Sequence, residues 1–308
     1  MLLDTASLYF RAFYGVPTSV TAPDGTPVNA VRGLLDFISR LVTDHAPTDL
    51  IAAWDDDWRP EFRVSAIPSY KAHRVAPEAA PELDGESVPD ELLPQVTLIE
   101  EILKASGIAR LGIPGFEADD VIGSLASQTS DPVLVVTGDR DLFQLVDDAQ
   151  PVRVLYTAAK GVGNAEVIDD AAVFSRYGVH AHEYAEFALL RGDTSDGLPG
   201  VKGIGEKTAA ALIRQFGTID QLVAAAEDES SDLKPGVRRN LLAGRGYIAV
   251  AGPVVQVART IELPAVASSL PSEPADADTL RALTETWGLT GAVDRMAQAF
   301  NWSNVSAP

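Results

Sequence analysis

The first half of the chain alternates short, almost continuously apolar runs with segments of helical periodicity. Four runs are strand candidates, at 2–3, 50–54, 133–136 and 152–156, and the first three lead directly into acidic or small polar residues. Runs without polar alternation are typical of strands that are covered on both faces. Helix candidates lie at about 28–44, 94–106 and 118–128. This rhythm predicts an α/β fold with a mostly parallel central sheet flanked by helices.

After Tyr177 the strand-like runs stop. Residues 183–250 have helical patterns punctuated by glycines, and a segment rich in Pro and Ser leads to a helical tail at about 278–300. The pattern also breaks between 58 and 94, and a connection of that length inside an α/β domain is usually functional. We therefore divide the chain into an α/β core at 1–182, which includes the segment 58–94, a helical region at 183–263 and a C-terminal extension at 264–308.

Composition narrows the class of protein. The 308 residues include 24 Lys and Arg against 44 Asp and Glu, a formal charge of −20, whereas the usual footprint of a nucleic-acid binder is basic. Acids that gather at one metal site would still leave room for local basic patches. The absence of Cys excludes disulfides, Cys-zinc sites and thiol catalysis. No apolar run is long enough for a membrane helix, and Asp4 stands where a signal peptide carries positive charge, so we expect a cytoplasmic protein.

Carboxylates follow several of the predicted strands. Asp4, Asp55 and Asp139 stand where three strands end, and parallel strands of an open α/β sheet end at one rim, where ligands bind. Further acids occur in three short clusters: Asp141 beside Asp139, then Glu117, Asp119 and Asp120 at a predicted helix start, then Asp193 and Asp196 in a glycine-bounded loop. So many anions at one rim would repel each other strongly unless multivalent cations neutralised them. Oxygen ligands without Cys favour Mg²⁺ or Mn²⁺.

Each of these acids also has a structural interpretation. Acids at a helix start complement the helix dipole, Asp139 could cap the following helix, and Asp55 with its two acidic neighbours could form a solvated turn. The pattern alone leaves both interpretations open.

A glycine-rich turn spans 198–208. Its glycine spacing suggests a phosphate-binding P-loop, but Glu206 occupies the position of the required lysine and no strand precedes it. A helix–hairpin–helix-type turn fits better, because its glycines allow close backbone approach and the amides of the next helix start bind phosphate without reading sequence. Lys202, Lys207 and Arg214 add positive charge beside the turn. The alternative is a purely structural corner between two helices.

Several motifs together carry a specific resemblance. They are Phe62-Arg63 with Tyr70-Lys71-Ala72-His73-Arg74, Gly115-Phe116-Glu117-Ala118-Asp119-Asp120, Thr137-Gly138-Asp139-Arg140-Asp141-Leu142, and the run from Gly192 to Gly205. In this order they resemble the 5′-nuclease family of flap endonucleases and 5′→3′ exonucleases. Over about residues 1–260 the chain is similar to the nuclease domain of bacterial family A DNA polymerases, without a polymerase attached.

The resemblance implies a PIN-like core with a helical arch at 58–94 and a helix–three-turn–helix DNA-binding subdomain. It implies two or three Mg²⁺ or Mn²⁺ ions, with Asp4, Asp55, Glu117 and Asp119 around one, Asp120 nearby, and Asp139, Asp141, Asp193 and Asp196 around the others. Lys71 and Arg74 are then the catalytic cations at the base of the arch. The implied DNA contacts are Arg11, Arg63, Gly200, Lys202, Gly203, Gly205 and Lys207, with K⁺ on the backbone carbonyls of Val201 and Ile204.

The implied activity is metal-dependent hydrolysis of DNA at 5′ flaps, nicks and 5′ ends in replication and repair, by a monomeric cytoplasmic protein associated with the nucleoid. Two departures stand out: Thr5-Ala6 replaces the glycine-containing turn that is usual after the first strand, and the arch is unusually acidic after Pro77. The alternatives are a PIN-like ribonuclease and a junction-binding protein without catalysis.

Overall fold

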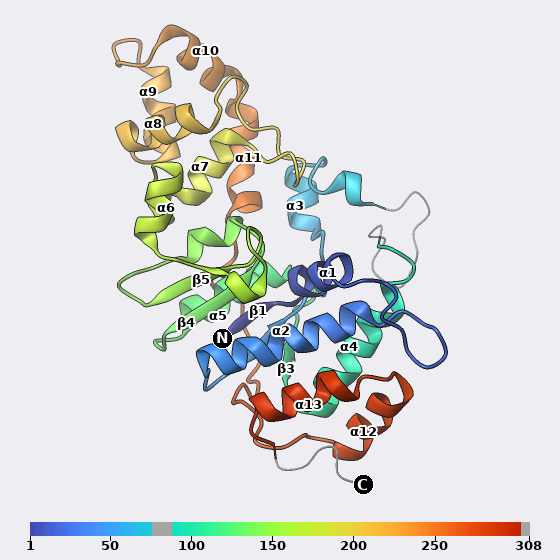
Figure 1. The fold of residues 1–308 in the computed structure, drawn as a ribbon. Coiled ribbons are helices and arrows are strands. Elements are labelled where there is room, and N and C mark those ends of the chain that lie inside the picture. Colours follow the sequence, from blue (N-terminus) through green and yellow to red (C-terminus); the bar gives the residue numbers. More distant parts are fainter. Residues whose placement is uncertain (76–87, 303–308) are drawn as a thin grey trace.

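The computed structural model describes residues 1–75 and 88–302, and the structural statements below concern that part of the chain. Its centre is one sheet with the strand order β3-β2-β1-β4-β5-β6 (Figure 1). The strands are β1 (Leu2–Asp4), β2 (Ile51–Ala53), β3 (Ala109–Leu111), β4 (Val133–Thr137), β5 (Val152–Tyr156) and β6 (Glu166–Ile168). All neighbouring pairs are parallel except β5 and β6, which are antiparallel. The predicted α/β class with a mostly parallel sheet is confirmed.

The sheet is buried on both faces because alternate side chains of each strand enter different cores. Leu3 and Val136 belong to one core, and their neighbours Leu2 and Val135 belong to the other. The first core is completed by α1 (Thr5–Gly15), α2 (Asn29–His45), α4 (Leu93–Ser106), α12 (Ala277–Thr286) and α13 (Thr290–Ala299). The second core includes α5 (Ala118–Gln128) and continues into the helical region.

The helical region extends from one end of the sheet, as Figure 1 shows. Its helices are α7 (Tyr184–Arg191), α8 (Glu206–Phe216), α9 (Ile219–Glu227), α10 (Pro235–Ala243) and α11 (Arg245–Val255), and α6 (Asp170–Tyr177), from the end of the core segment, packs against α8. The short helix α3 (Glu61–Ala66) packs against α11, which also packs against α7. The segment after β2 is thereby joined to the helical region.

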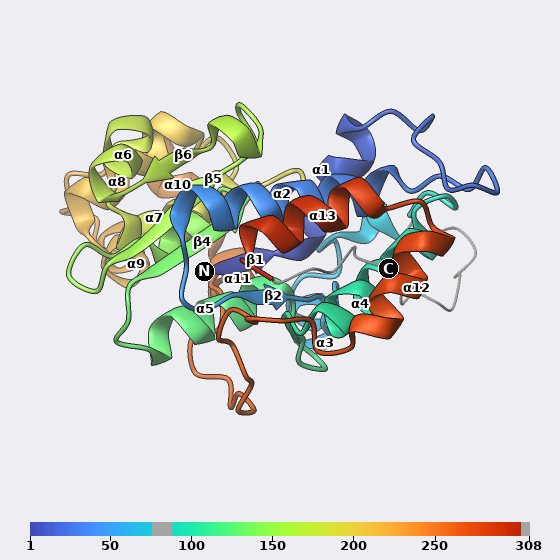
Figure 2. The same cartoon turned by 60° about the horizontal axis from the view of Figure 1, so that its bottom comes forward.

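The C-terminal extension returns to the α/β core. The Leu50 amide donates to the Ser268 carbonyl over 2.8 Å, and the Leu270 amide donates to the Thr48 carbonyl over 2.9 Å. Beyond this contact α13 lies alongside α2, as Figures 1 and 2 both show, and α12 packs against α4. The extension therefore covers the outer helices on one face of the sheet.

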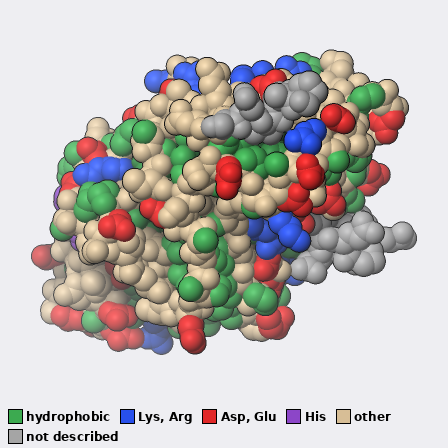
Figure 3. Space-filling model, turned by 90° about the horizontal axis from the view of Figure 1, so that it is seen from below, with side chains coloured by type: hydrophobic (Ala, Val, Ile, Leu, Met, Phe, Trp, Pro, Cys, Tyr) green, Lys and Arg blue, Asp and Glu red, His purple; other side chains and the backbone are tan. Residues whose placement is uncertain are grey.

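The structure adds to the predicted elements and leaves one of them undescribed. It contains two further strands, β3 and β6, each three residues long. The middle of the predicted arch, residues 76–87, lies outside the described residues. Within the described ranges, no helix has the length and apolar character needed to cross a membrane. Figure 3 shows acidic side chains spread over the face seen from below, so part of the negative charge is simply solvated.

Candidate active site

The carboxyl ends of the central strands open into a cavity of about 410 Å³. Asp4 ends β1, Asp55 follows β2 and Asp139 follows β4, and the order of the sheet makes β2, β1 and β4 adjacent. The cavity lies where connections leave the sheet in opposite directions, which is where open α/β sheets bind ligands. Seven residues predicted from the sequence line it: Asp4, Asp55, Lys71, Arg74, Glu117, Asp119 and Asp139.

Asp4 is held rigidly at the end of β1. One carboxylate oxygen accepts the Ser7 amide over 3.1 Å, so Asp4 also caps α1, and the other accepts the Thr137 hydroxyl over 2.6 Å. Burial raises the pKa of Asp4 to about 7, with a smaller contribution from the negative charges of Asp55 and Asp139. The structural and the functional interpretations of this acid are therefore compatible, because one side chain can serve both.

Three other acids are also buried near other negative charges, which disfavours their ionised form. Burial, followed by the charges of neighbouring acids, raises the pKa of Asp119 and of Asp141 well above the ordinary value. Burial also raises the pKa of Asp55, although the charge of Lys71 opposes the shift. Asp141 Oδ1 is buried without a hydrogen-bond partner, and an unsatisfied buried carboxylate oxygen is costly unless a cation or proton reaches it.

Other acids at the rim are paired with cations of the chain. Lys71 Nζ lies 2.6 Å from Glu117 Oε2, and Arg74 Nη2 lies 3.0 Å from Asp196 Oδ1. Asp193 Oδ2 lies 2.6 Å from Arg140 Nη2 and 3.2 Å from Arg191 Nη2. Burial favours a raised pKa for Glu117, but Lys71 and Arg63 outweigh it and the pKa of Glu117 is lowered.

These pairs divide the predicted metal ligands into two groups. In the described ranges, five of them form no ion pair with Lys, Arg or His: Asp4, Asp55, Asp119, Asp139 and Asp141. As the side chains stand in residues 1–75 and 88–302, no three carboxylate or imidazole groups are arranged to hold a metal ion. The structure thus brings the acids to one rim and places them in one another's electric field, but it does not close a ligand set.

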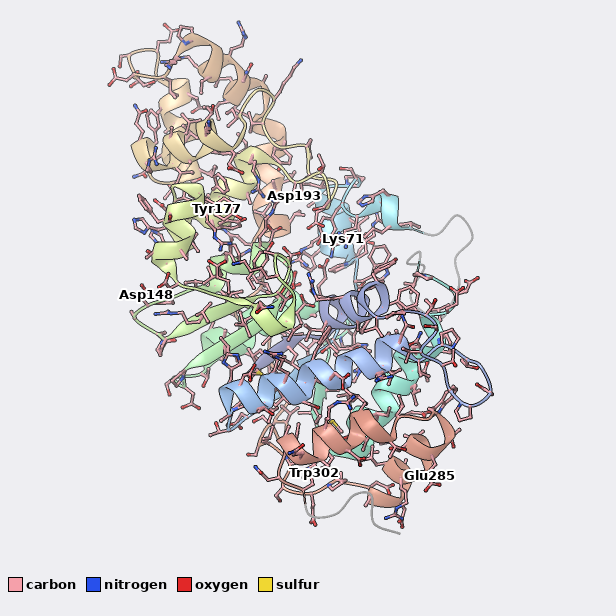
Figure 4. All side chains as sticks on the ribbon, viewed as in Figure 1. Lys71, Asp148, Tyr177, Asp193, Glu285 and Trp302 are labelled. Atoms are coloured by element: carbon pink, nitrogen blue, oxygen red, sulfur yellow. The ribbon has the colours of Figure 1, made fainter. Side chains whose placement is uncertain are left out.

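Lys71 is placed by its backbone as well as by its side chain. Its φ of 47° and ψ of 19° lie in the left-handed region, which is unfavourable for a residue with a Cβ. Its amide donates to the Asp196 carbonyl over 2.9 Å, and the nearby Ser69 hydroxyl donates to the Gly197 carbonyl over 2.8 Å. The loop that carries Asp193 and Asp196 therefore lies against the segment that carries Lys71, and Figure 4 shows Lys71 and Asp193 near each other above the sheet.

The structure corrects the role expected for Arg63 and shows how Asp120 lies beside the site. Arg63, expected to contact DNA, is only 2% exposed, and its guanidinium forms two hydrogen bonds with Asp120. Asp120, expected near the metals, is fully buried, and its oxygens also accept the amides of Glu117 and Ala258. Both side chains belong to the interior behind the cavity, because each satisfies the other's charge away from solvent.

The glycine turn lies between α7 and α8, as expected for two helices joined by a turn. Lys202 and Lys207 are exposed, whereas the side chains of Val201 and Ile204 are buried and anchor the turn. Gly200 and Gly203 have positive φ, and Gly205 precedes α8 without a side-chain cap for the first amides of that helix. Arg11 lies on α1 behind Gly138, and its Nε is buried without a partner.

Sequence reasoning missed several residues of the site. Thr137, Arg140 and Tyr70 stand inside the quoted motifs, but their roles follow only from contacts: Thr137 holds Asp4, Arg140 pairs with Asp193, and the Tyr70 hydroxyl donates to Glu117 over 2.7 Å. These contacts join positions 47 to 133 residues apart, so local sequence patterns give no signal for them.

Solved structures share this fold. A T5 5′-exonuclease described as having divalent zinc ions bound has a TM-score of 0.64 at 18% identity, covering 98% of this chain and 96% of that chain. The catalytic core of Rad2 in complex with DNA substrate has a TM-score of 0.56 at 18% identity, covering 97% of this chain and 91% of that chain. At such identities the likeness establishes the architecture alone.

Sequence comparisons establish the family. A 5′-3′ exonuclease of Streptomyces coelicolor is 58% identical over 96% of this chain and 98% of its own length. DNA polymerase I of Mycobacterium tuberculosis is 43% identical over 78% of this chain and 25% of its own length, which confirms the resemblance to one part of a bacterial DNA polymerase. Family models for the 5′-3′ exonuclease N-terminal resolvase-like domain and C-terminal SAM fold match residues 1–178 and 179–278. The chain therefore belongs to the 5′-3′ exonuclease family of enzymes.

Proposed function

We propose that this enzyme hydrolyses DNA phosphodiesters at 5′ flaps, nicks and 5′ ends, using two or three Mg²⁺ or Mn²⁺ ions. We further propose that it acts as a monomer in DNA replication and repair, in the cytoplasm at the nucleoid. The observation that carries the proposal is the cavity itself. Acids from segments far apart in the sequence line it together with Lys71 and Arg74, which is the combination that phosphodiester hydrolysis requires.

The donor chemistry fits a hard divalent cation. Every candidate ligand is a carboxylate, and one buried oxygen, Asp141 Oδ1, lacks a partner. Asp4, Asp55, Glu117 and Asp119 would hold one ion, and Asp139, Asp141, Asp193 and Asp196 would hold the others. A bound divalent cation supplies positive charge for the scissile phosphate and lowers the pKa of a water molecule to give the attacking hydroxide.

The chain's own cations would orient the phosphate. The Lys71 ammonium and the Arg74 guanidinium both line the cavity, and each is held by an acid that fixes its position, Glu117 and Asp196 respectively. A phosphate that enters the cavity would meet both cations. They would then offset the charge that develops on its oxygens during hydrolysis, without any covalent nucleophile.

The glycine turn would hold the duplex outside the cavity. Lys202 and Lys207 are exposed beside it, and Gly200, Gly203 and Gly205 allow the backbone to approach a phosphate closely. The uncapped amides at the start of α8 would bind that phosphate without reading sequence, and K⁺ on the carbonyls of Val201 and Ile204 would strengthen the contact. A Rad2 core solved with DNA substrate shares the fold, which supports DNA as the substrate.

The test is cleavage of a DNA flap labelled at its 5′ end, with Mg²⁺, Mn²⁺ or a chelator. We expect cleavage with either ion, none with the chelator, and none for Asp139→Ala although that variant stays folded. The control is Asp131→Ala, which removes an exposed carboxylate away from the cavity and should cleave like the wild type. Faster cleavage of RNA than of the flap would favour a PIN-like ribonuclease. Binding without cleavage would favour a junction-binding protein.

A further inference from the structure

We propose that Arg63 is a positioning residue for the cleavage reaction: it fixes the Glu117 carboxylate and, through it, the ammonium of Lys71. This inference rests on the proposed function, because it assigns a role within the same site. The sequence suggested a DNA contact for Arg63, but the buried guanidinium has no access to a duplex.

The guanidinium of Arg63 meets two carboxylates at once. Its Nη1 and Nη2 donate to the two oxygens of Asp120 over 2.8 and 2.7 Å, and Nη1 also lies 3.2 Å from Glu117 Oε1. A two-pronged contact of this kind fixes orientation as well as distance, because the guanidinium and the carboxylate must be coplanar. Glu117 is thus held from behind by a group that is itself locked.

Glu117 transmits this position to Lys71. The Tyr70 hydroxyl donates to Oε1 over 2.7 Å, and Lys71 Nζ donates to Oε2 over 2.6 Å. With Arg63 and Tyr70 on one oxygen, the other oxygen faces the ammonium. A single carboxylate therefore connects Arg63 with the cation proposed to touch the scissile phosphate, and Arg63 itself does not line the cavity.

The ion pair of Arg63 and Asp120 also contacts the helical region. Arg63 Nε donates to the Val254 carbonyl at the end of α11 over 3.2 Å, and the Ala258 amide donates to Asp120 Oδ1 over 2.8 Å. Helix α11 packs against α7, and the end of α7 leads into the glycine turn that is proposed to hold DNA. Arg63 and Asp120 therefore connect this turn, through α11, with the segment that carries Glu117. A shift of this pair would change the position of the duplex relative to Lys71.

Fold stability alone does not explain a buried ion pair here. Apolar side chains of similar volume often stabilise a core as well as a buried ion pair does. What apolar residues cannot supply is a donor that serves the carboxylates of Asp120 and Glu117 together. Arg63→Lys keeps the charge but loses the planar fork, so it removes the orientation specifically.

The experiment measures single-turnover cleavage of flap DNA with enzyme in excess, together with flap binding in Ca²⁺ and thermal unfolding. Arg63→Lys should lower the cleavage rate about 10- to 100-fold, the scale expected for misplacing a catalytic group, while the dissociation constant stays within about threefold. The matched control is Arg259→Lys. Arg259 is exposed, donates to the Gln144 backbone carbonyl over 2.6 Å and contacts neither Glu117 nor Asp120, so the same substitution there should leave the cleavage rate unchanged.

The decisive comparison uses a second background. If Arg63 acts through Lys71, Arg63→Lys should cause little further loss in a Lys71→Ala enzyme, because coupled residues are not additive. The same fold-loss in both backgrounds, or no loss in the wild-type background, would overturn the proposal. Should Arg63→Lys fail to fold, Asp120→Asn weakens the same fork and must show the same coupling to Lys71. If the unaltered enzyme cleaves no DNA, the proposed function itself fails, which is a distinct result.

Discussion

Gly197 lies where two loops of the candidate site, one carrying Lys71 and the other carrying Asp193 and Asp196, approach each other closely. A Cβ built on Gly197 would lie 2.9 Å from the Ser69 carbonyl carbon, closer still to its oxygen, and 3.5 Å from the Lys71 amide nitrogen. Gly197 also has a φ of 72°, which is unfavourable for any other residue. The substitution Gly197→Ala should therefore push the loop of Asp193 and Asp196 away from Lys71.

The magnitude follows from two separate costs. The positive φ costs about 1 kcal/mol for a residue with a Cβ. Non-bonded carbon contacts are optimal at about 3.5–4.0 Å, so relieving the overlap requires a shift on the order of 1 Å, and overpacking of this kind costs about 1–3 kcal/mol. We expect Gly197→Ala to lower the free energy of unfolding by about 2–4 kcal/mol. A displacement of about 1 Å at a catalytic group also predicts a loss of about 100-fold in cleavage rate.

Gly25 provides the matched control. Its φ is 93°, but nothing lies within 4 Å of a Cβ built there, so Gly25→Ala carries the backbone cost without the overlap. Urea unfolding and single-turnover flap cleavage should be measured for both variants. Gly25→Ala should lose about 1 kcal/mol and keep its cleavage rate. Equal cleavage by Gly197→Ala and Gly25→Ala would refute the argument that the close approach of the two loops positions Lys71.

Three further outcomes can be measured. If the Lys71 ammonium stabilises developing charge as proposed, Lys71→Ala should lower the single-turnover cleavage rate by about 100-fold or more while flap binding changes little; equal effects on both would contradict this. Changing Lys202 and Lys207 to Ala together should reduce the slope of log binding constant against log salt concentration for duplex DNA by about 0.9 per lost phosphate contact. An unchanged slope would favour the alternative that the turn is only a structural corner between two helices. The hydrogen bond to Asp170 raises the pKa of His180, so this pair stabilises the fold below the unfolded-state pKa and loses that contribution as pH rises through the folded-state pKa. Asp170→Asn should lower the His180 titration midpoint measured by NMR, and an unmoved midpoint would exclude this cause.

The sequence predicted the four inner strands of the sheet and missed the two edge strands, β3 and β6. Residues 133–136 and 152–156 are nearly continuous apolar segments, and both are strands. In β3, Arg110 interrupts a three-residue strand, and β6 begins with Glu166 at the antiparallel edge of the sheet. Edge strands are short and partly polar because one side of each faces no partner strand, so periodicity alone gives too weak a signal there.

The sequence predicted which residues lie at the site more reliably than it predicted the contacts between them. Asp4, Asp55 and Asp139 were expected at one rim because parallel strands end together, and the structure places them there. The sequence did not show that Arg63 faces inward, because its partner Asp120 is 57 residues away and the direction of α3 depends on its packing against α11. A motif can therefore indicate that a charged residue belongs to a functional site, but whether its side chain is buried or exposed depends on tertiary packing.

The arrangement of charges at the cavity explains how an acidic protein can accept a polyanion there. Burial and neighbouring charges raise the pKa of Asp4, Asp55, Asp119 and Asp141, so these acids gain most from an added cation. The cations Lys71, Arg74 and Arg140 line the same cavity and neutralise other acids of the rim. If divalent ions neutralise the acids that have no cationic partner, those acids no longer repel a phosphate. Lys71, Arg74 and Arg140 can then attract the phosphate into the cavity. The net charge of −20 then opposes DNA binding only at a distance, where salt screens it, and not at the point of cleavage.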